Sequence, residues 1–127
     1  FMPIEKIKEA FKDPDIQESS LRALITDLDH FEIARRLHEL SQEQKTQVFH
    51  LLDDDEKRQE LLYETDIDSR LEIQKSLDQN YLAALLDEMP EDEATDIIQE
   101  HPDDTQEDLL SKMEVQDAEV IKDLICY

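Results

Sequence analysis

The sequence of 127 residues contains no glycine. Glycine is the residue that adopts positive φ angles without steric cost, and both tight hairpin turns and phosphate-binding loops depend on it. Its absence excludes the glycine-rich loops of nucleotide-binding proteins and the standard EF-hand loop. It also argues against a compact β-sheet protein. The sequence therefore predicts an all-α fold.

Basic residues and cysteine are scarce as well. The chain has 13 Lys and Arg residues and 35 Asp and Glu residues, which gives a net charge of −22. Such a surface repels nucleic acid and anionic lipid, and it attracts cations. Cys126 is the only cysteine, so the chain has no disulfide framework, as is usual in a reducing compartment. No apolar run approaches the length of a membrane span, and we expect a soluble chain.

A short helical repeat is present instead. Apolar residues recur at i, i+3, i+4 and i+7, which is one face of a helix, and in two copies a proline then ends the helix. The residues on this face are Leu82, Leu85, Leu86 and Met89 before Pro90, and Ala94, Ile97, Ile98 and His101 before Pro102. The sequence thus predicts a unit of about twelve residues made of one helix and one turn.

The same register extends over most of the chain. The last apolar position of each unit is occupied by Leu28, Leu40, Leu52, Thr65, Leu77, Met89, His101, Met113 and Ile125. The intervals are twelve residues, except for thirteen between Leu52 and Thr65. The predicted helix caps are Ser19 or Ser20, Asp29, Ser41 in a capping box with Gln44, Asp54, Asp66, Asp78 and Asp103. Helices of roughly nine residues do not persist alone, so we expect stacked antiparallel helices in an α-solenoid.

Residues that could carry catalysis are few. His30, His38, His50 and His101 are scattered over different units, and we interpret them as structural. Cys126 has no evident histidine partner and is expected to be a small buried apolar residue. No serine stands in a nucleophile-elbow context. We therefore predict no catalytic residue and no enzyme activity.

Carboxylates are the candidates for ion binding. Asp92 and Asp96 are four residues apart at the start of one predicted helix, so their oxygens can converge on one face. Carboxylates without Cys or His ligands favour hard cations such as Mg²⁺, Ca²⁺ or Mn²⁺. The alternative is that acids in a first turn only favour the helix dipole and solubility. The run from Asp53 to Glu56 is interpreted as a solvated turn with caps.

The phrase LLDEMPEDEATDII, preceded by LRALITDLDHFEIARRLHEL, resembles the N-terminal cytoplasmic domain of MgtE-type magnesium transporters. The similarity extends from about Ser20 to Tyr127. It rests on the repeat register and on the pattern L-x-E-M-P-x-D-x-x-x-D-I-I. The helical repeats of the flagellar motor-switch protein are similar at this level.

The resemblance implies a right-handed superhelix of short helices. It also implies a regulatory role: Mg²⁺ would bind between this domain and the CBS domains of the same chain and favour the closed pore of a homodimer. In the full protein the domain would lie at the cytoplasmic face of the cell membrane. The CBS and membrane domains would follow Tyr127 and are absent from this chain. Residues 1–19 would form an N-terminal helix and linker, and residues 20–127 the helical-repeat domain.

The family's ion-contacting acids fall on three positions of this sequence. Two are Asp92 and Asp96, and the third is Glu60, before Leu61 and Leu62. The position of Glu60 assumes that the extra residue of the thirteen-residue interval lies in the acidic turn. The resemblance thus implies weak Mg²⁺ binding at Glu60, Asp92 and Asp96. A protein–protein scaffold with a groove at Gln74 and Lys122 is the main alternative, and an enzyme with paired acids is a third.

Overall fold

The computed structural model describes residues 2–125, and within them it contains ten α-helices, one 3-10 helix and no strand. The all-α prediction is therefore confirmed for this part of the chain. The helices are α1 (Pro3–Phe11), α2 (Glu18–Asp27), α3 (His30–Arg35), η1 (Leu37–Glu39), α4 (Gln42–Leu51), α5 (Asp55–Glu64), α6 (Ile67–Lys75), α7 (Gln79–Glu88), α8 (Glu91–Gln99), α9 (Asp103–Lys112) and α10 (Val115–Ile125). Most have nine or ten residues, as the repeat predicts.

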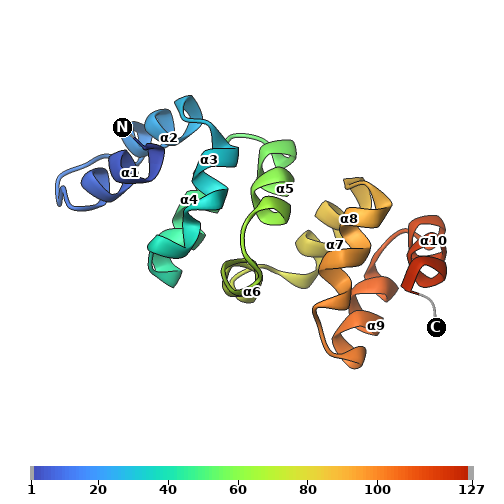
Figure 1. The fold of residues 1–127 in the computed structure, drawn as a ribbon. Helices are drawn as coiled ribbons and strands as arrows, with labels where there is room; N and C mark the ends of the chain where they lie inside the picture. The colour runs from blue at the N-terminus through green and yellow to red at the C-terminus, as the bar shows by residue number, and fades with distance from the viewer. Residues whose placement is uncertain (1, 126–127) are drawn as a thin grey trace. The chain divides into compact units, whose positions relative to one another are not determined.

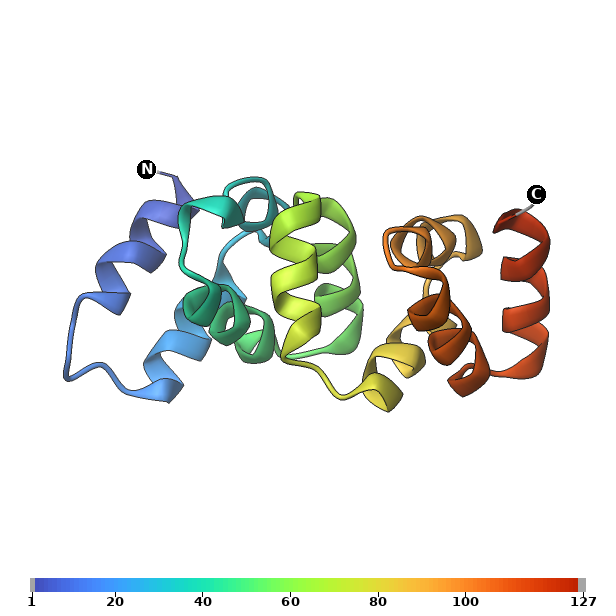
Figure 2. The same cartoon turned by 90° about the horizontal axis from the view of Figure 1, so that it is seen from below.

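The chain forms two compact units, one ending at Ser76 and the other beginning at Leu77. In the first unit α3 contacts α1 and α5, and α4 contacts α2 and α6 (Figure 1). In the second unit α7 packs on α9 and α8 packs on α10; Figure 2 shows both units from below. Each helix thus packs mainly on the helix two positions along the chain. The superhelix of the whole chain, and its division at residues 19 and 20, stay predictions.

Helices end here without the left-handed residue that glycine usually supplies. No residue within 2–125 has a positive φ angle. The residue after most helices is extended instead, and it turns an apolar or small side chain inward. These extended residues are Leu28, Leu40, Leu52, Thr65, Met89 and Met113. The last apolar position of these repeats therefore lies just outside the helix.

A capping side chain then starts the next helix directly. The predicted caps Asp29, Asp54, Asp66 and Asp78 each accept a hydrogen bond from a backbone N–H two or three residues on. The predicted capping box is also confirmed: the Gln44 N–H donates to Ser41 Oγ at 3.2 Å, and the Ser41 N–H donates to Gln44 Oε1 at 3.1 Å.

Two of the predicted caps are wrong. Pro102 takes the cap position of α9, and Asp103 is the first helical residue. The fixed φ of proline suits that position, and an acid inside the first turn still favours the helix dipole. The helix α2 begins at Glu18 with Gln17 at its cap, so Ser19 and Ser20 lie within its first turn.

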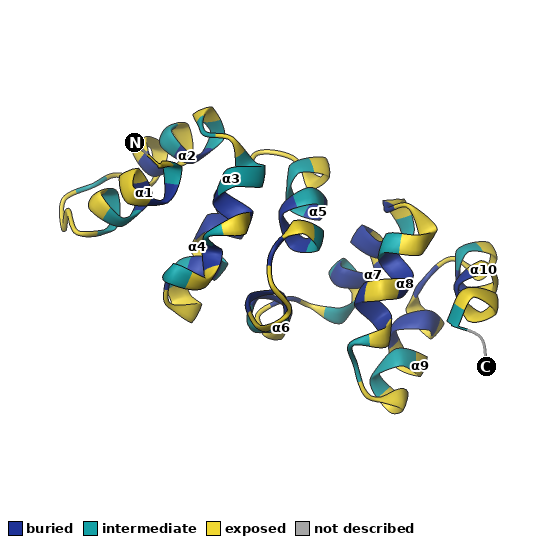
Figure 3. Ribbon diagram, viewed as in Figure 1, coloured by how far each residue is buried: buried dark blue, intermediate teal, exposed yellow. Residues whose placement is uncertain are grey.

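The core of each unit is built from the apolar positions of the repeat. Figure 3 shows buried segments in dark blue along the helices of both units. Polar members of the pattern are buried with them, and among these Gln74 in α6 is only 3% exposed. The scaffold hypothesis places Gln74 on an open groove, and this part is wrong because α6 packs on α4 there. Lys122 is exposed, in a hollow between α9 and α10.

Arginines satisfy the carbonyl groups that the abrupt helix ends leave without a helical partner. Arg70 is buried, and it donates to the carbonyl oxygens of Leu62, Tyr63 and Thr65 at 2.8, 2.7 and 2.9 Å. In this way one guanidinium group of α6 closes the C-terminal end of α5. At the end of α4 the same task is shared, because Arg58 donates to the His50 carbonyl and Arg22 to the Leu51 carbonyl.

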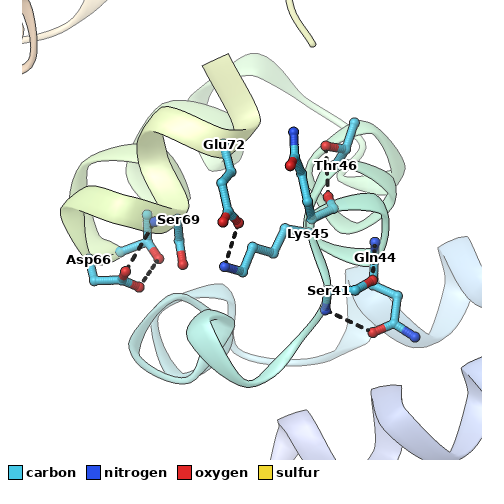
Figure 4. A network of polar contacts seen from close by, with 9 residues as sticks. Ser41, Gln44, Lys45, Thr46, Asp66, Ser69 and Glu72 are labelled. Carbon is cyan, nitrogen blue, oxygen red and sulfur yellow. Dashed lines mark hydrogen bonds and ion pairs between the residues drawn. The ribbon is translucent and has the colours of Figure 1, made fainter. Parts of the chain in front are cut away.

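A buried lysine joins α4 to α6 (Figure 4). Lys45 is almost fully buried, and its Nζ lies 2.7 Å from Glu72 Oε2. Nearby, burial raises the pKa of Asp66, but hydrogen bonds from Ser69 and the charge of Lys45 outweigh it and hold that pKa below its ordinary value. The lysine is thus compensated by one direct carboxylate partner and a second acid close by.

We expect Arg70→Met to lower the free energy of unfolding by about 2–4 kcal/mol, because three carbonyl groups lose a charged donor and two of those contacts are buried. Urea denaturation measures this. The exposed Arg35, which pairs with Glu32 at 2.7 Å, is the control, and Arg35→Met should change stability by less than about 1 kcal/mol. Equal effects of the two substitutions would contradict the role given to Arg70.

Candidate functional site

Asp92 and Asp96 lie on the exposed side of α8. The helix begins after Pro90, and it is held to the second unit by the buried side chains of Ala94, Ile97 and Ile98. Because these side chains are packed, the opposite side of the helix faces solvent, and both carboxylates are exposed there. They stand one turn apart, as the sequence predicts. The structure therefore presents the predicted pair on a fixed helical surface.

Glu60 lies on α5 in the first unit. The two residues that follow it, Leu61 and Leu62, are fully buried and anchor the helix. The Glu60 side chain is 37% exposed, and its Oε1 lies 3.3 Å from Nε2 of His30, the first residue of α3. The sequence does not indicate this contact, because thirty positions separate the two residues and only the packing of α3 on α5 brings them together.

The extra residue of the thirteen-residue interval lies in the acidic turn. Elsewhere the cap follows the extended apolar residue directly, as Ser41 follows Leu40. Here Asp53 stands between Leu52 and the cap Asp54. This is the register on which the choice of Glu60 depends. Asp55 and Glu56, which complete the acidic run, belong to the first turn of α5.

The predicted ligands occupy separate positions in the fold. Glu60 belongs to the first unit, whereas Asp92 and Asp96 belong to the second. Within residues 2–125 no group of three or more His, Cys, Asp or Glu side chains is arranged to hold a metal ion. Two carboxylates are compatible with Mg²⁺, which keeps several water ligands. The assignment of Glu60, Asp92 and Asp96 as ligands stays a prediction.

Comparison with known families identifies the chain. Residues 28–127 match the MgtE intracellular N domain, and this stretch covers 100 of the 127 residues. The chain belongs to this family. It is thus an N domain of an MgtE-type magnesium transporter, the cytosolic part of such a protein. No curated protein matches the chain. Among residues 2–125, no helix has both the length and the apolar character that crossing a membrane requires.

The histidines of this MgtE N domain have separate surroundings. Burial lowers the pKa of His50, and the charge of Arg58 lowers it further. Burial also lowers the pKa of His101, against the opposite effect of Glu100. His38 is exposed on η1. The structural interpretation of these side chains stays a prediction. Cys126 lies outside the described residues.

A second group of acids, which the sequence pattern does not reveal, joins the end of α7 to the start of α10. Asp87 Oδ1 accepts a hydrogen bond at 3.1 Å from the N–H of Glu114, the residue before α10. Burial raises the pKa of Asp87; the Glu114 N–H acts in the opposite direction, and the neighbouring carboxyl groups of Asp117 and Glu114 raise it further. The ionised form of Asp87 is therefore disfavoured in the folded domain.

We expect Asp87→Asn to stabilise this domain at pH 7, by a few tenths to about 1 kcal/mol. Because the folded pKa of Asp87 is raised, its contribution favours folding below the ordinary value of 3.8 and is lost as the pH rises through the folded pKa. The advantage of Asn should therefore vanish as the pH falls below that range. Thermal unfolding between pH 3 and 7 tests this, with the exposed Asp15→Asn as a control for net charge. A gain that is equal in both variants would contradict the prediction.

Proposed function

We propose that this domain is the ion-responsive regulatory part of its magnesium transporter. Mg²⁺ would bind between its acidic surface and the CBS domains of the same chain, and would thereby favour the closed pore. The proposal is carried by the family match over residues 28–127. The role proposed is regulatory and not enzymatic, at the cytoplasmic face of the membrane and within a homodimer.

The distribution of charge supports this proposal physically. Residues 77–127 contain sixteen acidic and two basic residues, a net charge of −14, whereas residues 1–76 contain nineteen acidic and eleven basic residues, a net charge of −8. Most of the total of −22 thus lies in the unit that holds Asp92 and Asp96. A surface of this kind repels another acidic surface until cations neutralise it. Mg²⁺ suits such a shared position, because it needs only one or two carboxylates from each side and retains water.

The repeat also supports the proposed superhelix. Within each unit every helix packs mainly on the helix two positions along, which is the packing rule of an α-solenoid. The right-handed superhelix implied by the family resemblance would continue that rule across Ser76 and Leu77. Successive helix starts, with their first-turn acids, would then recur along the molecule as a series of carboxylate-rich turns.

We expect MgCl₂ at about 10 mM to raise the melting temperature of the 127-residue chain by a few degrees more than NaCl does at equal ionic strength. A bound divalent ion stabilises the folded state by mass action, whereas NaCl only screens charge repulsion. Differential scanning fluorimetry measures the difference, and EDTA should reverse it. Identical shifts for the two salts would reduce the effect to screening and count against an ion site on this domain.

The double substitution Asp92→Asn with Asp96→Asn should remove about half or more of this Mg²⁺-specific shift, because it removes the only carboxylates proposed as ligands in the second unit. Asp104→Asn with Asp108→Asn is the matched control, since these acids take the same places at the start of α9 and change the net charge equally. Glu60→Gln tests the position in the first unit. If the two double substitutions lower the Mg²⁺-specific rise in melting temperature equally, that rise depends on overall charge and not on Asp92 and Asp96.

A further inference from the structure

The last helix carries apolar side chains on more than one side. Ala118 and Ile121 of α10 are buried against the unit, as in every repeat. Three more apolar side chains face solvent: Val115 is 75% exposed, Val120 37% and Leu124 50%. Within residues 2–125 only Met2 and Ile67 are exposed large apolar residues besides these. Val120 and Leu124 are four residues apart and share one side of the helix.

The neighbouring helix α8 shows that this is not a general property of the fold. Its buried side chains are Ala94, Thr95, Ile97 and Ile98, and its exposed positions are all polar. A surface helix normally keeps one apolar stripe, and a helix that is apolar on several sides is normally covered on them. The side of α10 that carries Val120 and Leu124 therefore has the character of a surface that another helix covers.

The charges around this surface indicate what kind of helix fits it. Glu119 and Asp123 are exposed beside Val120 and Leu124, and Lys122 lies within 3.8 Å of Glu119. The unit as a whole carries sixteen acidic against two basic residues. A second copy of the chain brings another −22 charges and is repelled, as is an anionic membrane surface. A helix with an apolar stripe flanked by Lys or Arg suits this surface in two ways: its stripe can cover the aliphatic side chains, and its bases are attracted by the acidic charge.

We propose that the side of α10 formed by Val120 and Leu124, bordered by Glu119 and Asp123, is a docking surface for a basic amphipathic helix of a protein partner. The apolar stripe of the partner covers the two aliphatic side chains, and its flanking bases pair with the two acids. The interaction requires no metal ion, so it is separate from the Mg²⁺-dependent docking proposed above. Added salt weakens it, and Mg²⁺ competes with it.

A synthetic Leu/Lys amphipathic helix of about sixteen residues, labelled with a fluorophore, is the probe. Its binding to the 127-residue chain is measured by fluorescence anisotropy in EDTA at about 0.15 M NaCl. A Leu/Glu peptide with the same apolar stripe and a Leu/Lys peptide of scrambled order are the control ligands. We expect binding of the first peptide only, with contacts mapped to α10 by amide chemical-shift changes.

The decisive variant is Val120→Ser with Leu124→Ser, and the control is Met2→Ser with Ile67→Ser, which removes two apolar side chains from the first unit that are slightly more exposed. We expect the α10 variant to weaken binding about tenfold, since two aliphatic contacts are lost, and the control variant to leave it unchanged. All four positions are exposed, so the melting temperatures should stay close to that of the unaltered chain.

Two results would overturn this proposal. Equal affinity of both variants would mean that a cationic peptide only follows the overall negative charge. Self-association in sedimentation velocity that Val120→Ser with Leu124→Ser abolishes would mean that a second copy covers α10. Neither result bears on Mg²⁺ binding at Asp92 and Asp96, which the thermal shifts test separately.

Discussion

The structure depends on how a helix ends when the chain has no glycine. With no positive φ angle within residues 2–125, the polypeptide leaves most helices through an extended residue, and in most of these repeats the residue is apolar and buried. The next residue is commonly a capping acid, a serine or a proline. A turn of this kind is very short, so it reverses the chain abruptly. Such turns recur about every twelve residues. The packing of helices two positions apart follows from these reversals.

The same constraint explains what the few basic residues do. Carbonyl groups at an abrupt helix end need donors from elsewhere. Arg22, Arg58 and Arg70 supply them, and Lys45 compensates acids between α4 and α6. Within residues 2–125, ten of the thirteen basic residues have such a contact or an ion pair. Little positive charge is therefore left to offset the acids on the surface, and the surplus is greatest in the second unit.

Local features of this fold could be predicted from the sequence, and non-local ones could not. The caps at Asp29 and Ser41 depend only on residues within one turn, so their spacing was sufficient. Asp103 was wrong because Pro102 occupies the cap position that its carboxylate was expected to fill. The contacts of Arg70 with α5 and of His30 with Glu60 depend on which helices pack together. The acidic pair Asp92 and Asp96 could be located from spacing alone, whereas its proposed role as a ligand depends on a partner surface, which spacing does not reveal.

Local cohesion and surplus charge together favour a domain that responds to ions at its surface. Each helix is held by near neighbours in the chain, mainly through apolar stripes, with the buried side chains of Lys45 and Arg70 as charged exceptions in the first unit. The carboxylates of α8 face away from those stripes, so neutralising them changes what the domain can approach without changing what holds it together. A cation that binds such acids therefore acts mainly on docking and only weakly on folding. This separation is what the proposed regulatory role would require, because such a domain would have to engage and release its neighbour while it stays folded.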